Sequence, residues 1–246
     1  MLLEHCTWLE VEEYLGRSRG IIFPVGSVEQ HGPTGLLGTD FICAQTIARS
    51  VGEAAGALVG PTISVGMSVH HLAFPGSITL RPSTLLLVVR DYVLSLVRYG
   101  FTRFFFLNGH GGNTPTLKAA FSEVQAELAG GAGEEDVRLQ AVNWWEAPAV
   151  KEVIDGLFGD REGGHATASE ISLTQWVLPD RIKTAPLGPY PSRRDGFHGP
   201  ADFRRRYPDG RIASDPGLAA PEHGEKVFRA AVPALAGMYR AFLEEE

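Results

Sequence analysis

The sequence predicts an α/β protein: one domain over residues 1–246, built as a three-layer α/β/α sandwich with a mainly parallel central sheet. Four short apolar runs, rich in β-branched and aromatic residues, alternate along the chain with segments of helical periodicity. This alternation is typical of strand–helix–strand units, which place parallel strands between two layers of helices. With 246 residues, of which 44% are hydrophobic, the chain is long enough to bury one large core.

Four buried strands are expected. They cover residues 20–25, 58–65, 102–107 and 137–143, and each ends at or near glycine, asparagine or serine. Because these runs have little polar alternation, they are typical of strands covered by helices on both faces.

The helices between the strands carry clear signals at their ends. Over residues 114–128, apolar residues recur at offsets of four, three and four, as on one face of a helix. A second helix is expected over 82–99, because it begins with Pro-Ser-Thr and is followed by Gly100, a typical left-handed stop. A third helix follows Asp40, and a final one runs from about 221 to 244.

The stretch 187–221 interrupts this regular order. It is rich in Pro, Gly and Arg and shows no periodic apolar pattern. Irregular loops of this length are uncommon inside a compact domain unless they have a function. We expect this stretch to cover a site, either of its own subunit or of a neighbour.

Charge and cysteine content argue against several classes of protein. A net charge of −7 provides no basic surface for nucleic acid. Cys6 and Cys43 form no C-x-x-C pair, so neither a disulfide framework nor a zinc ribbon is indicated. The acidic N-terminus is unlike a signal peptide, and the longest apolar run, 85–89, is too short to span a membrane. We therefore expect a cytoplasmic protein that binds neither nucleic acid nor membranes.

Residues able to bind a metal ion or to move a proton follow the predicted strands. In chain order they are Glu29, His31, Asp40, His110, His165 and Glu170. The carboxyl ends of parallel strands lie at one edge of a sheet, so these side chains are expected to meet there. Mixed histidine and carboxylate ligands suit Zn²⁺, Mn²⁺ or Fe²⁺.

The first three of these residues also have simpler explanations. Glu29 and His31 are two positions apart, so in an extended loop both side chains project to the same side. The alternative is a solvated loop with a surface histidine. Asp40 follows Gly-Thr at a helix start, where it is a good N-cap or first-turn acid. A carboxylate in that place can also bridge two metal ions.

The later residues leave alternatives open as well. His110 lies in Asn-Gly-His-Gly-Gly-Asn, whose glycines allow close approach of a ligand. The competing interpretation, a loop that cradles phosphate, lacks both the P-loop Lys-Ser/Thr and G-x-G-x-x-G. His165 fits a polar loop, and Glu170 fits the first turn of a helix capped by Thr167 or Ser169.

Three further residues are candidates for contact with a substrate. His70 and His71 follow the second predicted strand, and His70 is our candidate to line the cleft. Trp144 and Trp145 end the fourth strand. They are either core or interface packing, or an aromatic wall for a planar substrate.

Taken together, these segments resemble the creatininase (creatinine amidohydrolase) family. The motifs PVGSVEQHGPTGLLGTD, FPGSITL, FLNGHGGN and GGHATASEIS occur in the family's order and span most of the chain. The resemblance implies a two-metal centre that hydrolyses carbon–nitrogen bonds in amide-like substrates, frequently within a hexamer. It implies His165 and Glu170 as the groups that handle protons. The metal ligands that it implies, with Asp40 bridging, are Glu29, His31, Asp40, His110 and Glu170.

The chain departs from this family in two places. Creatininase itself carries a metal-binding glutamate two residues after the histidine of the third-strand loop, where this chain has Gly112. The remaining carboxylate ligand must then come from Glu170, and creatinine is disfavoured as the substrate. Thr167 stands where many members have glycine, yet the spacing from His165 to Glu170 is intact.

The sequence therefore predicts a hydrolase that uses two divalent metal ions (Zn, Mn or Fe) to cleave a small-molecule amide, working as a homo-oligomer. Such a pair of ions polarises a carbonyl and lowers the pKa of water toward about 7. Alternatives within the family are a formylamino-pyrimidine deformylase and a peptide-trimming enzyme. A non-catalytic metal- or phosphate-binding α/β protein is the alternative from another class, but it leaves unexplained why the candidate residues cluster at strand ends.

Overall fold

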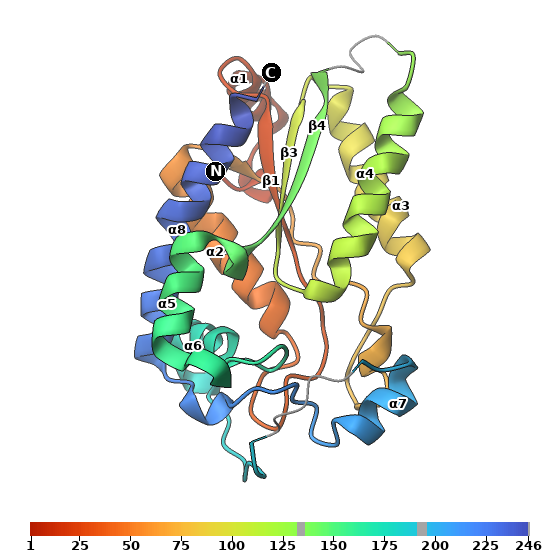
Figure 1. Ribbon diagram of the computed structural model, residues 1–246. Helices are drawn as coiled ribbons and strands as arrows, with labels where there is room; N and C mark the ends of the chain where they lie inside the picture. The colour runs from red at the N-terminus through yellow and green to blue at the C-terminus, as the bar shows by residue number, and fades with distance from the viewer. Residues whose placement is uncertain (132–135, 191–195, 246) are drawn as a thin grey trace.

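A four-stranded parallel sheet lies between two layers of helices in the computed structural model, which describes residues 1–131, 136–190 and 196–245 (Figure 1). The strand order is β2-β1-β3-β4, and all three pairings are parallel. The strands are β1 (Gly20–Val25), β2 (Leu58–Val59), β3 (Arg103–Asn108) and β4 (Arg138–Asn143). The predicted α/β class with a parallel sheet is confirmed.

The second strand is much shorter than expected. We predicted a strand over 58–65, but β2 ends at Val59. The next residues are Gly60 and Pro61, and proline has no N–H to donate to a ladder. The chain still follows β1 for a few residues, because the N–H of Ile63 donates to Pro24.

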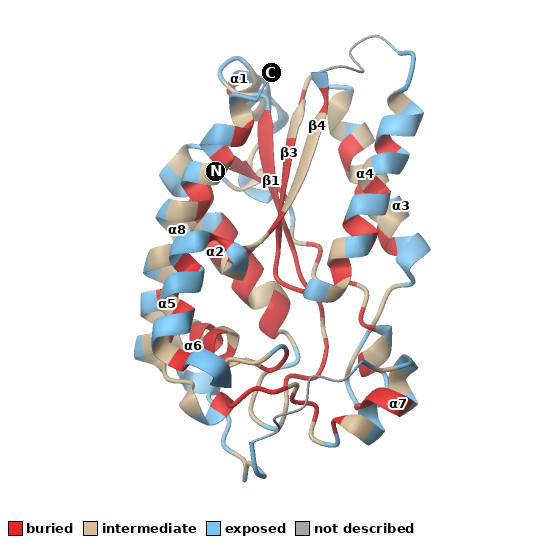
Figure 2. Ribbon diagram, in the orientation of Figure 1, coloured by how far each residue is buried: buried red, intermediate tan, exposed pale blue. Residues whose placement is uncertain are grey.

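Helices cover both faces of the sheet. In chain order they are α1 (Trp8–Leu15), α2 (Thr39–Ala55), α3 (Pro82–Val97), α4 (Thr114–Leu128), α5 (Pro148–Phe158), α6 (Ala168–Val177), α7 (Gly199–Arg206) and α8 (Pro221–Leu243). Helices α2, α5, α6 and α8 lie on one side of the sheet, and α3 and α4 on the other (Figure 1). Each side has its own apolar cluster, and every residue of β1 is buried between them (Figure 2). The edge strand β4 is only partly buried, unlike the fully buried strand that we expected.

The predicted helices are present, but α1, α5 and α7 were not predicted. Helix α4 has the expected bounds, and Gly100 follows α3 with a φ of +100°. The stretch 187–221 is not wholly irregular, because it contains α7. This short helix is mostly polar and buries little besides Phe203, so it leaves no periodic apolar pattern in the sequence.

The strand order places one edge of the sheet where a site is expected. The chain leaves β1 toward β2 on one side, whereas β3 lies on the other side of β1. Loops after β1 and β3 therefore separate at their carboxyl ends and leave a crevice, the usual ligand position in open α/β sheets. Among the described residues, no helix is both long and apolar enough to cross a membrane.

Candidate metal centre

The residues singled out from the sequence meet at the carboxyl edge of the sheet. In the described part of the chain, their ligand atoms form overlapping groups within 4.8 Å of one another. The groups are Glu29–Asp40–His110, His31–Asp40–Glu170 and Glu29–His31–His165. Asp40 belongs to the first two groups, as a carboxylate shared between two ions would.

All three residues of the Glu29–Asp40–His110 group are buried. His110 Nδ1 lies 3.2 Å from Glu29 Oε1 and 3.2 Å from Asp40 Oδ2. Both carboxylate oxygens of Glu29 and the Oδ2 of Asp40 are buried and have no hydrogen-bond partner among the described residues. Leaving buried carboxylate oxygens unpaired is costly, so their arrangement suits a cation.

The second group shares Asp40 and adds residues from the first loop and from α6. His31 Nε2 lies 2.9 Å from Asp40 Oδ1 and 3.8 Å from Glu170 Oε2. Glu170 also closes a capping box at the start of α6, where its Oε1 accepts from the N–H of Thr167 at 2.5 Å. Thr167 is therefore the N-cap of α6. The other oxygen of Glu170, Oε2, is not used by the cap and can bind an ion.

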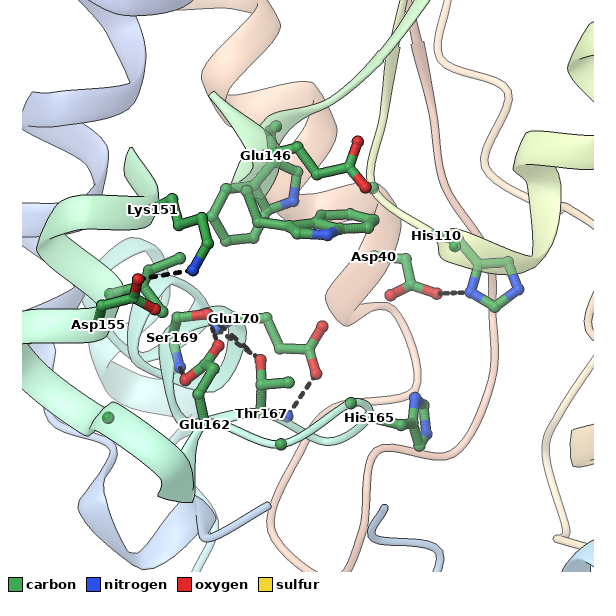
Figure 3. Close-up of a pocket in the computed structure, with 18 of the residues that line it drawn as sticks. Asp40, His110, Glu146, Lys151, Asp155, Glu162, His165, Thr167, Ser169 and Glu170 are labelled. Atoms are coloured by element: carbon green, nitrogen blue, oxygen red, sulfur yellow. Dashed lines mark hydrogen bonds and ion pairs between the residues drawn. The ribbon is translucent and has the colours of Figure 1, made fainter. Parts of the chain in front are cut away.

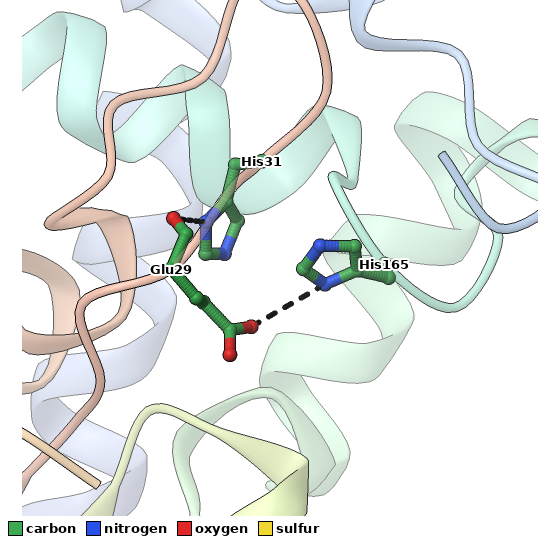
Figure 4. Close-up of side chains that lie close together, drawn as sticks. All are labelled: Glu29, His31 and His165. Atoms are coloured by element: carbon green, nitrogen blue, oxygen red, sulfur yellow. Dashed lines mark hydrogen bonds and ion pairs between the residues drawn. The ribbon is translucent and has the colours of Figure 1, made fainter. Parts of the chain in front are cut away.

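Backbone carbonyls hold each histidine ring in a defined orientation. His31 Nδ1 lies 3.1 Å from the carbonyl of Glu29, His110 Nε2 3.0 Å from that of Met67, and His165 Nε2 2.7 Å from that of Gln30. A carbonyl only accepts, so each of these nitrogens carries the proton. The other nitrogen of each ring then faces the carboxylates, as in histidines that bind metals. Figure 4 shows His31 and His165 close to Glu29.

The charged groups shift one another's pKa values. Burial would lower the pKa of His31, but Asp40 and Glu170 outweigh it and raise the pKa to about 10. In the same way, Glu29 and Asp40 hold the pKa of His110 well above its usual value against the effect of burial. Burial would raise the pKa of Asp40, yet His31 and His110 lower it to about 2. For Glu170, burial prevails and raises the pKa to about 7. The carboxylates of the cluster thus stabilise positive charge on His31 and His110.

Asp40 is not the helix cap that local sequence allowed. The N-cap of α2 is Gly38, and Asp40 lies in the first turn without making a cap hydrogen bond. Gly109, after β3, is required here, because a Cβ at this position would lie 2.3 Å from the Asp40 carbonyl oxygen. The glycine therefore lets the β3 loop pack against the start of α2, which brings His110 to Asp40.

A cavity of about 890 Å³ opens beside the cluster (Figure 3). Asp40, His110, His165 and Glu170 line its inner part, together with Trp144 and Trp145. Trp144 is buried in the core as well, whereas Trp145 is half-buried. The cavity wall farther out bears the acids Glu146, Asp155, Asp160 and Glu162.

The ring of His70 lies beside those of His71 and His110, with 4.1 and 6.1 Å between centroids. Its ring stacks on Phe197 with 5.1 Å between centroids, and it is not among the described residues that line the cavity. Its proposed contact with substrate stays a prediction.

Part of the stretch 187–221 covers the cluster of its own chain. The ring of Phe203, on α7, lies edge-on to His71 with 4.7 Å between centroids. Ser214 donates to the carbonyl of His165, and Ile212 pairs with His165 as an isolated β-bridge. Residues 191–195 of this stretch lie outside the described part. The remainder encloses the histidines of the same subunit.

Two residues near the cluster were not assigned a role from the sequence. Gln30 is buried and contacts both His71 and His165 at 2.9 Å. His71 is 1% exposed, and its Nε2 lies 3.3 Å from Glu29 Oε1. The position of Gln30 between Glu29 and His31 in the sequence pointed to the site, but the neighbouring residues do not indicate that the Gln30 side chain points inward. His71 had been noted only as a neighbour of His70.

Comparison with known proteins gives a consistent result. The family model for creatininase, described as creatinine amidohydrolase, matches residues 4–239. A creatinine amidohydrolase from Pseudomonas putida is 28% identical over 95% of this chain and 94% of its own length. A mycofactocin precursor peptide peptidase from Mycolicibacterium smegmatis is 31% identical over 85% of this chain and 79% of its own. A solved structure named Creatininase Mn superposes with a TM-score of 0.87 at 25% identity, covering 99% of both chains.

Proposed function

This chain belongs to the creatininase family of amidohydrolases, and we propose that it hydrolyses an amide-like carbon–nitrogen bond with two divalent metal ions. The observation that carries the two-ion proposal is the shared position of Asp40. Its two carboxylate oxygens face His31 on one side and His110 on the other, at 2.9 and 3.2 Å. A carboxylate with an oriented histidine on each side could offer one oxygen to each of two ions.

The residues present fit such a pair. Glu29, Asp40 and His110 would hold one ion, and His31, Asp40 and Glu170 the other. Carboxylate and imidazole donors suit Zn²⁺, Mn²⁺ and Fe²⁺, and a creatininase of similar structure is named for Mn. When bound, the ions would polarise the amide carbonyl and lower the pKa of water.

His165 is placed to move protons for this reaction. Its Nε2–H is held by the Gln30 carbonyl, so Nδ1 is the atom that accepts a proton and passes it to the leaving nitrogen. Burial and the neighbouring His31 lower the pKa of His165 to about 3, which keeps the ring neutral in the metal-free protein. Glu170, whose pKa burial raises to about 7, is a second proton carrier at the cavity wall.

The cavity supports a substrate larger than creatinine. Its volume of about 890 Å³ lies toward the upper end of the range for small-molecule sites, roughly 300–1,000 Å³. Of the described lining residues outside the ligand groups, four are acidic, and the lysine among them, Lys151, is already paired with Asp155. Such walls favour neutral or cationic substrates over anionic ones. Peptide trimming is therefore the second candidate function, supported by the similarity to a peptide peptidase.

Three expectations extend this proposal beyond the site. We propose a small-molecule amide as the partner, a homo-oligomer such as a hexamer as the assembly, and the cytoplasm as the location. Membership of the family supports the substrate and the assembly, and the two free cysteines, Cys6 and Cys43, support the location. Light scattering on the eluted protein measures the assembly directly.

The decisive experiment combines metal analysis with a substrate screen. Purified protein is stripped with a chelator, reloaded with Mn²⁺, Zn²⁺ or Fe²⁺, and assayed on creatinine, N-formyl amines and short peptides of neutral, basic and acidic sequence. We expect two ions per chain and hydrolysis that depends on them, fastest on neutral or basic peptides. A protein that binds no metal, or that hydrolyses amides equally well after stripping, would overturn the proposal.

A further inference from the structure

One buried amide lies between two histidines behind the metal centre. The Nε2 atom of Gln30 lies 2.9 Å from His71 Nδ1, 2.9 Å from His165 Nε2 and 3.1 Å from the carbonyl of Gly210. Its Oε1 accepts from the N–H of Gly32 at 2.8 Å. The Gly32 donor and the Gly210 acceptor therefore define which end of the amide is oxygen and which is nitrogen.

The protons of this network have one consistent assignment. His165 Nε2 lies 2.7 Å from the carbonyl of Gln30, which can only accept, so His165 carries its proton on Nε2. A protonated nitrogen cannot accept from the Gln30 amide. The two amide hydrogens of Gln30 then go to the Gly210 carbonyl and to His71 Nδ1. His71 must carry its own proton on Nε2.

With this assignment, the Nε2–H of His71 points toward Glu29, which is a candidate metal ligand. His71 Nε2 lies 3.3 Å from Glu29 Oε1, close enough to attract the carboxylate, although the two atoms do not form a hydrogen bond in the metal-free structure. His110 Nδ1 approaches the same oxygen at 3.2 Å, on the side of the metal group. An N–H from His71 leaves the other lone pairs of the Glu29 carboxylate available to a cation.

Packing prevents the His71 ring from turning to another partner. Its side chain is 1% exposed. The ring lies 4.1 Å from that of His70, 4.3 Å from that of His165 and 4.7 Å from that of Phe203, measured between centroids. Aromatic rings therefore surround it on several sides.

We propose that Gln30 and His71 are positioning residues of the metal centre: Gln30 selects the His71 tautomer, and the His71 Nε2–H orients the Glu29 carboxylate toward the ion. The inference rests on the proposed two-ion function. Through its backbone carbonyl, Gln30 also sets the His165 ring. A single residue between two ligands of the first loop thus couples metal binding to the group that moves protons.

Two substitutions of similar volume test the role of the His71 N–H. His71→Gln keeps a side-chain donor within reach of Glu29, whereas His71→Leu removes it. Outer hydrogen-bond partners of metal ligands are typically worth about 10–100-fold in affinity. We expect His71→Leu to weaken binding of Mn²⁺ or Zn²⁺ by about that factor, and His71→Gln to recover most of it. Competition with a chelator measures the affinities, and thermal melts by circular dichroism establish that each variant is folded.

The matched control is His223→Leu. His223 is a partly buried histidine that contacts the carbonyl of Leu218 and belongs to none of the candidate metal groups. The His223→Leu variant should bind metal with the affinity of the wild type. Equal metal affinity for folded His71→Leu and His71→Gln would overturn the proposal. Wild-type protein that binds no ion would instead count against the proposed function.

A second measurement needs no variant at His71. Long-range ¹⁵N–¹H spectra distinguish the two neutral tautomers of histidine, and we expect His71 and His165 both to be protonated on Nε2. In Gln30→Met, which removes the amide donor, the His71 signal should shift toward the other tautomer. An Nδ1–H signal for His71 in the wild type would overturn the assignment, whatever the protein does with metal.

Discussion

The two halves of the candidate metal centre are built differently. Glu29 and His110 come from the loops that follow β1 and β3, and both carboxylate oxygens of Glu29 are buried without a hydrogen-bond partner among the described residues. In the other half, Glu170 lies in the first turn of α6, with its side chain 14% exposed, and already accepts from the N–H of Thr167. The first half thus keeps both oxygens of its glutamate clear of the backbone, whereas the second shares a carboxylate with a helix cap.

This difference predicts unequal affinity. Neither oxygen of Glu29 accepts from a backbone N–H, whereas one oxygen of Glu170 does, and Glu170 must often lose a proton first, because burial raises its pKa to about 7. Because position 112 is glycine here, Glu170 is the only carboxylate besides Asp40 in the second candidate group. We expect the ion beside Glu29 to bind more tightly than the ion beside Glu170.

Asp40→Asn should have the largest effect, because both halves depend on this carboxylate. Asparagine keeps the size of the side chain but removes its charge and one acceptor oxygen. We expect both ions to be lost at micromolar metal, and activity to fall by roughly 10³-fold or more, at least the scale of losing one well-placed electrostatic group. Elemental analysis of the folded variant measures this. A variant that keeps both ions would show that Asp40 is not shared.

Comparing Glu29→Gln with Glu170→Gln tests whether the two halves bind their ions with unequal affinity. Glutamine at 170 can still accept from Thr167, so the capping box survives while the charge is lost. We expect Glu29→Gln to lose the tighter ion and Glu170→Gln only the weaker one. Titration with Mn²⁺, followed by electron paramagnetic resonance, separates the two steps. Loss of the tighter ion in Glu170→Gln would reverse the order proposed for the halves.

Gly112→Ala should weaken the Glu29 half alone. A Cβ at Gly112 would lie 2.3 Å from His110 Nε2 and 2.8 Å from the Met67 carbonyl, which would push the ring away from its position. We expect a loss of about 10–100-fold in affinity for the tighter ion, as for other changes that disturb ligand orientation. Gly111→Ala is the matched control, because nothing lies within 4 Å of a Cβ there. Equal affinities in the two variants would contradict this.

The smallest predicted effect is the change of metal affinity with pH. Burial would lower the pKa of His31, but Asp40 and Glu170 raise it from 6.5 to about 10, so the ring is protonated in the metal-free protein at neutral pH. Its ion pairs stabilise the metal-free fold fully below pH 6.5, and this contribution is lost as pH rises through about 10. Binding an ion must displace that proton, so metal affinity rises with pH.

Calorimetry in buffers of different ionisation enthalpy counts the protons released. Below pH 7, the protonation of Glu170 should weaken its half further, so acidification removes the weaker ion first. Simultaneous loss of both ions on acidification would count against unequal halves.

Much of this molecule could be predicted from local patterns. The bounds of β1 and α4 follow from an apolar run and from helical periodicity, and the positions of the candidate ligands follow from the rule that loops converge at the carboxyl ends of parallel strands. The early end of β2 and the short helix α7 were missed, because a proline interrupts one and the other buries too few apolar residues to leave a pattern.

The sequence by itself determined the fold class, the family and the residue types that meet at the sheet edge. Tertiary structure decided what each of these residues does there. Asp40 was an ambiguous helix cap until packing of the β3 loop placed His110 beside it. Gln30 was an unremarked neighbour of two ligands until its amide met the Gly210 carbonyl, 180 positions away. Hydrogen-bond partners so distant along the chain set ring orientation and proton position, and no local pattern contains that information.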